Sequence, residues 1–76
     1  MKELIEFLAR SLVDQPDAVK VEEEDDGDRI IFHLFVADDD MGKVIGKQGR
    51  IANAMRDLLK VAAARQGARA RLEIGD

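Results

Sequence analysis

The chain has 76 residues, enough for one domain with a single hydrophobic core and too few for a catalytic domain joined to a regulatory one. It holds no cysteine and one histidine, which excludes a disulfide framework, a thiolate metal site and a zinc cluster, and predicts a reducing compartment. The formal net charge is −4, which taken alone disfavours a polyanionic partner.

Residues 2–14 are predicted to form an amphipathic helix, because large apolar side chains recur there at helical spacing. These are Leu4, Ile5, Leu8 and Leu12. Pro16 is expected to stop the helix. The segment lacks the apolar run of a signal peptide, and no run approaches the roughly 18 apolar residues of a membrane span, so we expect a cytoplasmic protein with no membrane contact.

Residues 18–36 are predicted to form a β-hairpin. Val19 and Val21 alternate with charged residues in a first strand, and residues 30–36 form the second. The acidic run of residues 22–28 contains an Asp26-Gly27 turn signal, and we interpret it as a solvated hairpin tip rather than a cation site.

The second strand has an apolar outer side as well as a core side. Ile31, His33 and Phe35 alternate with the predicted core residues, so they lie on the opposite face of the sheet. An exposed apolar patch commonly marks a partner surface, and we therefore predict a protein interface here or along the nearby first helix. His33 has no nucleophile or carboxylate pair placed to work with it, so we interpret it as a surface or interface residue.

A glycine loop follows a short predicted helix over Met41 to Ile45, which one aspartate of the run 38–40 can cap. Gly46 and Gly49 enclose two polar residues, and a helix is predicted from Arg50 to about Arg65. Glycine allows positive φ and a close approach of another chain. The free N–H groups at the start of the following helix favour an anion such as phosphate.

Two better-known glycine motifs fail on spacing. A Walker A loop needs four residues between its glycines and then Lys-Ser/Thr, whereas Gly42 and Gly46 enclose three and no hydroxyl follows Lys47. A dinucleotide fingerprint needs glycine at position 44, which is valine. What remains is Gly-x-x-Gly in the context Ile-Gly-Lys-x-Gly-Arg, similar to the loop that clamps about four nucleotides by their backbone in KH domains.

The predicted RNA-binding residues form one continuous stretch around this loop. They are Lys43, Val44, Ile45, Gly46, Lys47, Gln48, Gly49 and Arg50. Lys47 and Gln48 are expected to be exposed, whereas Ile45 and Ile51 are expected to turn inward on their helices. Bases would enter an apolar groove between the loop and the edge of the second strand.

The helix after the loop carries a possible extension of the RNA-binding track. Its residues are Asn53, Arg56 and Lys60, although a solvated helix face explains them equally well. The core-facing stripe of this helix is predicted from Ile51, Ala54, Leu58, Val61 and Ala62. Gly67 marks the end of the helix.

Residues 70–74 alternate as a closing strand, which completes an α+β order of helix, strand, strand, helix, helix, strand. The two helices between the second and third strands allow a parallel crossover, so we predict a three-stranded mixed sheet with three helices packed on one face. Residues 1–76 then form a single domain.

Charge is segregated along the chain. Residues 1–40 hold 4 Lys/Arg and 13 Asp/Glu, whereas residues 41–76 hold 8 and 3. The glycine loop lies in the basic half, which is typical of a nucleic-acid face on an otherwise acidic body.

The order of elements and the stretch Val36 to Ile51 resemble the type II KH fold of the small bacterial single-KH-domain proteins of the KhpA type, over essentially the whole chain. The resemblance implies a cytoplasmic RNA-binding protein that acts as an RNA chaperone. It also implies pairing as a homodimer or with a Jag-like KH partner, and links to cell shape and cell-envelope homeostasis. We expect no cofactor, metal or small-molecule substrate.

Two functions remain open, and a third is disfavoured. The first is a module that binds single-stranded RNA. The second is a dimerisation or assembly module whose RNA contact is made mainly by its partner, which the acidic net charge and the Ile31/Phe35 patch favour. An enzyme is disfavoured, because no nucleophile, metal cluster or acid–base pair stands out.

Overall fold

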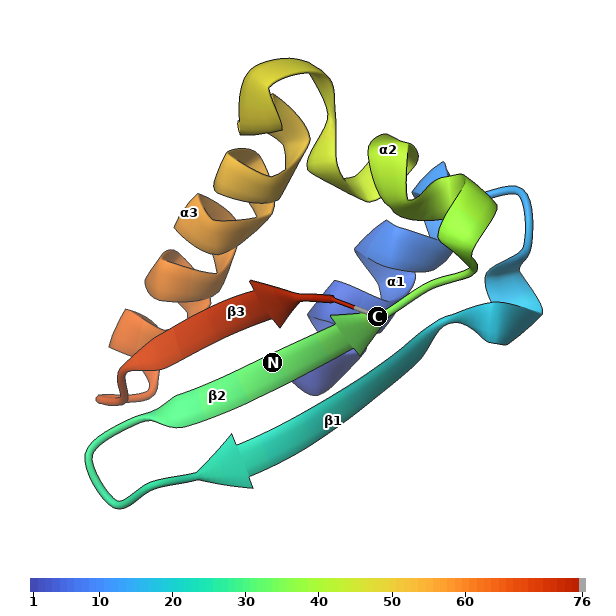
Figure 1. The fold of residues 1–76 in the computed structure, drawn as a ribbon. Helices are drawn as coiled ribbons and strands as arrows, with labels where there is room; N and C mark the ends of the chain where they lie inside the picture. Colours follow the sequence, from blue (N-terminus) through green and yellow to red (C-terminus); the bar gives the residue numbers. More distant parts are fainter. Residues whose placement is uncertain (76) are drawn as a thin grey trace.

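The computed structural model describes residues 1–75 and contains the predicted elements in the predicted order. Helix α1 spans Lys2–Leu12, strands β1 and β2 span Lys20–Asp25 and Ile30–Phe35, helices α2 and α3 span Met41–Ile45 and Arg50–Arg65, and strand β3 spans Ala70–Ile74. Figure 1 shows the three strands as one layer, with the helices on a single side of it.

The sheet order is β1-β2-β3, with β1 antiparallel and β3 parallel to the central strand β2. The mixed three-stranded sheet is therefore confirmed. Strand β1 is longer than predicted, because its acidic residues through Asp25 pair with β2. The turn itself is closed by Asp26, whose side chain accepts the backbone N–H groups of Asp28 and Arg29 at 3.1 and 2.9 Å.

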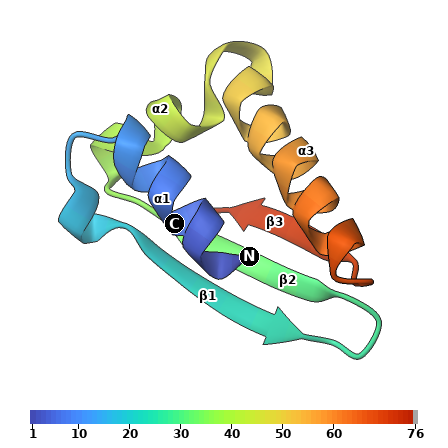
Figure 2. The same cartoon turned by 180° about the vertical axis from the view of Figure 1, so that it is seen from behind.

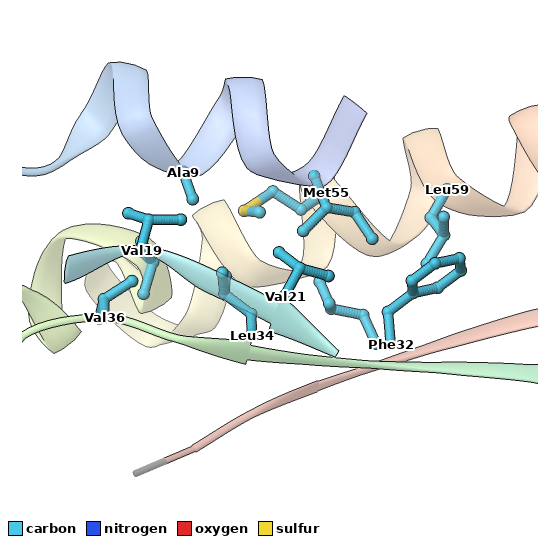
Figure 3. Close-up of a cluster of buried hydrophobic side chains, with 11 residues drawn as sticks. Ala9, Val19, Val21, Phe32, Leu34, Val36, Met55 and Leu59 are labelled. Carbon is cyan, nitrogen blue, oxygen red and sulfur yellow. The ribbon is translucent and has the colours of Figure 1, made fainter. Parts of the chain in front are cut away.

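The core lies between the sheet and helices α1 and α3 (Figure 3). Phe32 and Leu34 of the central strand are fully buried, and Ile5 and Ala9 of α1 cover them together with α3. Figure 2 shows α1 and α3 crossing the same face of the sheet. Among residues 1–75, nothing covers the opposite face, so its residues meet solvent.

The buried stripe of α3 differs from the prediction by about one residue. The buried residues are Ala52, Met55, Leu59 and Ala63, whereas Leu58 and Val61 are 49% and 55% exposed. Both stripes have helical spacing, and the predicted one contains the larger aliphatic side chains. The position of α3 on the sheet determines which stripe faces the core, so the prediction that Ala54, Leu58 and Val61 are core residues was wrong.

Asp40 ties the start of α2 to the segment that follows α1. It is buried, and its carboxylate accepts the backbone N–H groups of Asp14 and Gln15 at 3.2 and 3.0 Å. The side chain makes no hydrogen bond to the N–H groups of its own helix, so the predicted capping of α2 was wrong. Helix α1 ends at Leu12, two residues earlier than predicted, before a short turn over Pro16–Ala18.

Candidate nucleic-acid interface

The Gly46–Gly49 loop links α2 to α3 in a tight turn at one end of the molecule (Figure 1). Gly46 has φ 75° and ψ 173°, a conformation open essentially only to glycine. Its own N–H closes α2 by donating to the Gly42 carbonyl at 2.9 Å. A Cβ at Gly46 would lie 2.6 Å from Cγ1 of Ile51, so the loop can only close without a side chain there.

Lys47 and Gln48 lie exposed at the apex of the loop, as predicted. Gln48 has a left-handed φ of 59° and Gly49 has φ 74°, which turns the chain directly into α3. Helix α3 has 16 residues and begins directly after the loop. Its first N–H groups and its positive dipole end therefore lie beside these two side chains. The arrangement favours an anionic group at the loop.

Lys43 contributes less charge to the loop than predicted. Its ammonium lies 2.7 Å from the Asp14 carboxylate and 3.2 Å from that of Asp40. The hydrogen bonds that this ammonium donates to Asp14 and Asp40 raise the pKa of Lys43 above its ordinary value, although burial opposes the effect. The lysine therefore fastens α2 to the region after α1, and it is not a free cation.

Two apolar residues before the loop, Val44 and Ile45, differ from the prediction in their burial. Val44 is fully buried, so its side chain offers no surface to a ligand, whereas Ile45 is 37% exposed and was wrongly predicted to be core. Helix α2 is a five-residue element, and only one of its two adjacent aliphatic residues can face the core. Ile51 is half-buried under Gly46 and packs against the core, as predicted.

The groove that the structure contains lies along α3 and borders β3, not β2 as predicted. The central strand is paired on both sides, so it offers no free edge. A hollow of about 270 Å³ lies between α3 and β3, lined by Arg56, Leu59, Lys60, Ala70, Arg71, Leu72 and Glu73. The predicted extension residues Arg56 and Lys60 therefore line the groove.

The outer edge of β3 presents to this groove backbone groups that are not paired with another strand. Arg69 and Gly75 bond to β2 at either end of the strand, and alternate residues bond in a parallel pair, so the N–H and C=O groups of Ala70, Leu72 and Ile74 point away from the sheet. Nε of Arg56 donates to the Leu72 carbonyl at 3.3 Å. Donors and acceptors on an open edge can read the polar edges of bases.

Asn53 connects the loop with the groove. Its Oδ1 accepts a hydrogen bond from Nη1 of Arg56 at 3.3 Å, and its Nδ2 would lie 3.9 Å from a Cβ placed on Gly49. The structure thus brings the loop, Asn53, Arg56 and Lys60 into one continuous track along α3.

The predicted protein interface lies on the uncovered face of the sheet. Ile31, His33 and Phe35 are all half-buried there, and Nε2 of His33 lies 3.3 Å from the Glu24 carboxylate of the neighbouring strand. The sequence prediction missed a more exposed apolar surface, the stripe of Ala54, Leu58 and Val61 on α3. The same residues were singled out from the sequence by their spacing but assigned to the core.

Within residues 1–75, no cluster of three or more histidines or carboxylates is arranged to hold a metal ion. In the same part of the chain, no helix combines the length and apolar character needed to cross a membrane.

Comparison with known proteins agrees with this geometry. A family model described as KhpA/KhpB, KH domain matches residues 2–74. The chain belongs to the KhpA/KhpB family of KH domains. A relative named RNA-binding protein KhpA from Halalkalibacterium halodurans is 54% identical over 76 residues, the full length of both chains. Another of that name from Chlamydia pneumoniae is 43% identical over 97% of this chain and 95% of its own. The named KhpA proteins are RNA-binding proteins, which agrees with the prediction that this chain is not an enzyme.

Solved structures show the same fold at low identity. Era from Aquifex aeolicus matches with a TM-score of 0.65 at 16% identity, over 96% of this chain and 28% of its own. A second Era structure, solved with MgGDPNP and nucleotides 1506–1542 of 16S ribosomal RNA, matches with a TM-score of 0.56 at 19% identity, over the same shares. The type II KH fold of the KhpA-like chain is thereby confirmed.

Proposed function

We propose that this KhpA-family protein binds single-stranded RNA through the Gly46–Gly49 loop and the groove between α3 and β3. The observation that carries the proposal is the loop itself, where Lys47 and Gln48 stand exposed between two positive-φ glycines at the start of α3. Relatives named RNA-binding protein KhpA and the Era structure that contains ribosomal RNA support it.

In this proposal the loop positions the strand and the groove receives the bases. Backbone N–H groups at the start of α3, with Lys47 and Arg50, contact phosphates without regard to sequence. Bases then lie over Ile45 and Ile51 and toward the open edge of β3. The groove suits unpaired bases, because a duplex cannot splay its bases into it.

The test replaces both apex residues, Lys47→Asp with Gln48→Asp. Aspartate tolerates the left-handed conformation at position 48, so the variant should fold. We expect the affinity for a short unstructured RNA to fall about tenfold or more, with an unchanged circular dichroism spectrum. Lys20→Asp, on an exposed residue of β1, is the control. Unchanged RNA affinity in the loop variant would contradict the proposal.

We further propose that the protein acts as a cytoplasmic RNA chaperone or post-transcriptional regulator, with the links to cell shape and the cell envelope that the resemblance implies. A single small module holds RNA weakly, which suits transient contacts during strand exchange. The loop variant should then lose any acceleration of the annealing of complementary RNA strands, measured against the Lys20→Asp control.

The second candidate is an assembly module, a homodimer or a pair with a Jag-like KH protein. The exposed Leu58 and Val61 favour it, because a helical stripe of large apolar side chains in water commonly marks a partner surface. Leu58→Glu should prevent self-association in analytical ultracentrifugation, and Phe35→Glu should not. The opposite result would assign the interface to the Ile31/His33/Phe35 face, and dimerisation insensitive to both would exclude these two surfaces.

A further inference from the structure

A second group of cations lies at the far end of the groove from the glycine loop. Lys60 of α3 and Arg69, the residue before β3, line a hollow of about 600 Å³ that also includes the hairpin residues Asp28 and Arg29. This hollow shares Lys60, Ala70 and Arg71 with the smaller one beside Arg56, so the two are adjacent. Figure 1 shows the hairpin and the end of α3 together, opposite the loop.

Lys60 and Arg69 are the cations of this hollow that form no ion pair within residues 1–75. The other two arginines of its wall are each held by a neighbouring carboxylate, at 2.7 Å for Arg71–Glu73 and 3.3 Å for Arg29–Asp26. Both free side chains are exposed, and neither packs in the core. They stand on the α3 and β3 side of the hollow, and its unpaired carboxylate, Asp28, stands on the hairpin side.

The spacing fits one RNA strand that touches both ends. Lys60 lies ten residues beyond Arg50 in α3, about 15 Å along the helix axis. The track between them consists of Asn53, Arg56 and the open edge of β3 at Leu72. Across the hollow from Arg69, the hairpin carries acidic residues, which repel phosphates.

We propose that Lys60 and Arg69 together bind a second phosphate of the RNA strand gripped by the loop, so that the groove holds the strand at two points. The inference rests on the proposed RNA binding and adds a defined bound length. The loop sets one limit of the bound segment, and the Lys60–Arg69 pair sets the other, where the acidic hairpin turns the strand away from the protein.

The test compares Lys60→Gln/Arg69→Gln with the matched control Lys2→Gln/Lys20→Gln, which removes two charges outside the groove. The slope of log affinity against log salt for a long unstructured RNA should become shallower by about 0.7, the value of one phosphate, in the groove variant only. Affinity at low salt should fall about threefold to tenfold. An unchanged slope in the groove variant, or an equal change in the control, would overturn the inference.

A length series separates a strand contact from general attraction. Wild-type affinity should rise with RNA length until the strand spans loop and Lys60, then level off, and the groove variant should level off at a shorter length. Inorganic phosphate or a mononucleotide that competes as well as the oligonucleotide would show a free-phosphate site and overturn the strand proposal.

The loop variant distinguishes this inference from the function on which it rests. When Lys47→Asp/Gln48→Asp abolishes binding and the groove variant changes nothing, the second contact fails and RNA binding stands. When the loop variant changes nothing, the proposed function itself fails.

Discussion

Gly46 and Gly49 share a motif but have different physical reasons to be glycine. Gly46 lies where φ is 75° and ψ 173°, and a Cβ would also collide with Ile51 at 2.6 Å. Gly49 has an ordinary left-handed conformation, with φ 74° and ψ 15°, and a Cβ would meet nothing closer than 3.9 Å. The first glycine is required by both conformation and space, and the second by conformation alone.

Gly46→Ala should therefore destabilise the protein by roughly 3 kcal/mol, from backbone strain and overpacking together. Gly49→Ala should cost about 1 kcal/mol, from strain alone. Urea unfolding at equilibrium measures both values. Equal losses for the two variants would show that Ile51 yields to the added methyl group.

Asp40 is a buried carboxylate that joins α2 to the segment after α1. Burial alone would raise its pKa, but the N–H of Asp14, the Lys43 ammonium and the N–H of Gln15 outweigh it and hold the pKa of Asp40 below its ordinary value. A lowered pKa means that the ionised carboxylate stabilises the fold at pH values above the pKa that Asp40 has in the unfolded chain. This stabilisation is lost as the pH falls through the pKa of the folded state.

Acid should therefore lower the melting temperature below about pH 4, as Asp40 takes up a proton. Asp40→Asn should melt at a lower temperature at pH 7 and lose less on acidification than the wild type does. The raised pKa of Lys43 gives the opposite pH dependence. Its contribution to stability is complete below the pKa of the unfolded lysine and is lost in strong alkali. The exposed Asp39→Asn is the control, and an acid decline of equal steepness in Asp40→Asn would contradict the assignment.

At the scale of elements, α3 carries three faces with separate tasks. Leu59 and Met55 fill the core, Arg56 and Lys60 line the groove, and Leu58 and Val61 face solvent. Its end is fixed by Gly67, whose N–H donates to Ala64 while that of Ala68 donates to Ala63, at 3.1 and 2.9 Å. One helix thus contributes to the core, to the proposed RNA groove and to the proposed assembly surface.

Adjacent leucines of this helix should respond differently to truncation. Leu59→Ala should cost about 3 kcal/mol at every protein concentration, because it leaves a cavity beside Phe32. Leu58→Ala should leave the monomer within about 0.5 kcal/mol of wild type. If the protein assembles through this face as proposed, any loss for Leu58→Ala should grow with protein concentration, because the side chain then stabilises only the assembled form. Thermal unfolding over a concentration series checks both, and a large loss independent of concentration at Leu58 would contradict its exposure.

At the scale of the whole molecule, opposite charges occupy opposite edges of the sheet. The acidic strand β1 forms one edge, and β3, with Arg69 beside it and Arg71 within it, forms the other. The protein therefore has a net charge of −4, although three cations, Arg56, Lys60 and Arg71, line the groove beside β3. Long-range repulsion by the acidic residues acts on the association rate, whereas local contacts between cations and phosphates act on the slope of affinity against salt.

Neutralising Glu22, Glu23 and Glu24 to glutamine should raise the association rate for RNA at low salt, by roughly tenfold or less. The difference should vanish when salt shortens the screening length to about 8 Å or less. The slope of affinity against salt should hardly change, because these residues touch no phosphate. Stopped-flow mixing measures the rates, and a gain that persists at high salt would place β1 in direct contact with RNA.

Local patterns in the sequence were sufficient for the elements and their order. Alternation in residues 30–36 and 70–74, the Asp26-Gly27 turn and the Gly-x-x-Gly spacing each reflect short-range backbone requirements, which a sequence displays directly. The exposed apex of Lys47 and Gln48 followed from the same spacing, since glycine on both sides leaves these residues in a tight turn.

Only the tertiary structure determined which side of each helix is buried, which strand edge is unpaired and which cations form ion pairs. Two stripes of α3 satisfied the helical period, and the docking angle on the sheet selected Leu59 over Leu58. Lys43 and Lys60 look alike in the sequence, yet Asp14, distant along the chain, neutralises the first and leaves the second in the groove. Periodicity fixes what one segment can do alone, whereas burial and pairing depend on segments that meet only after folding.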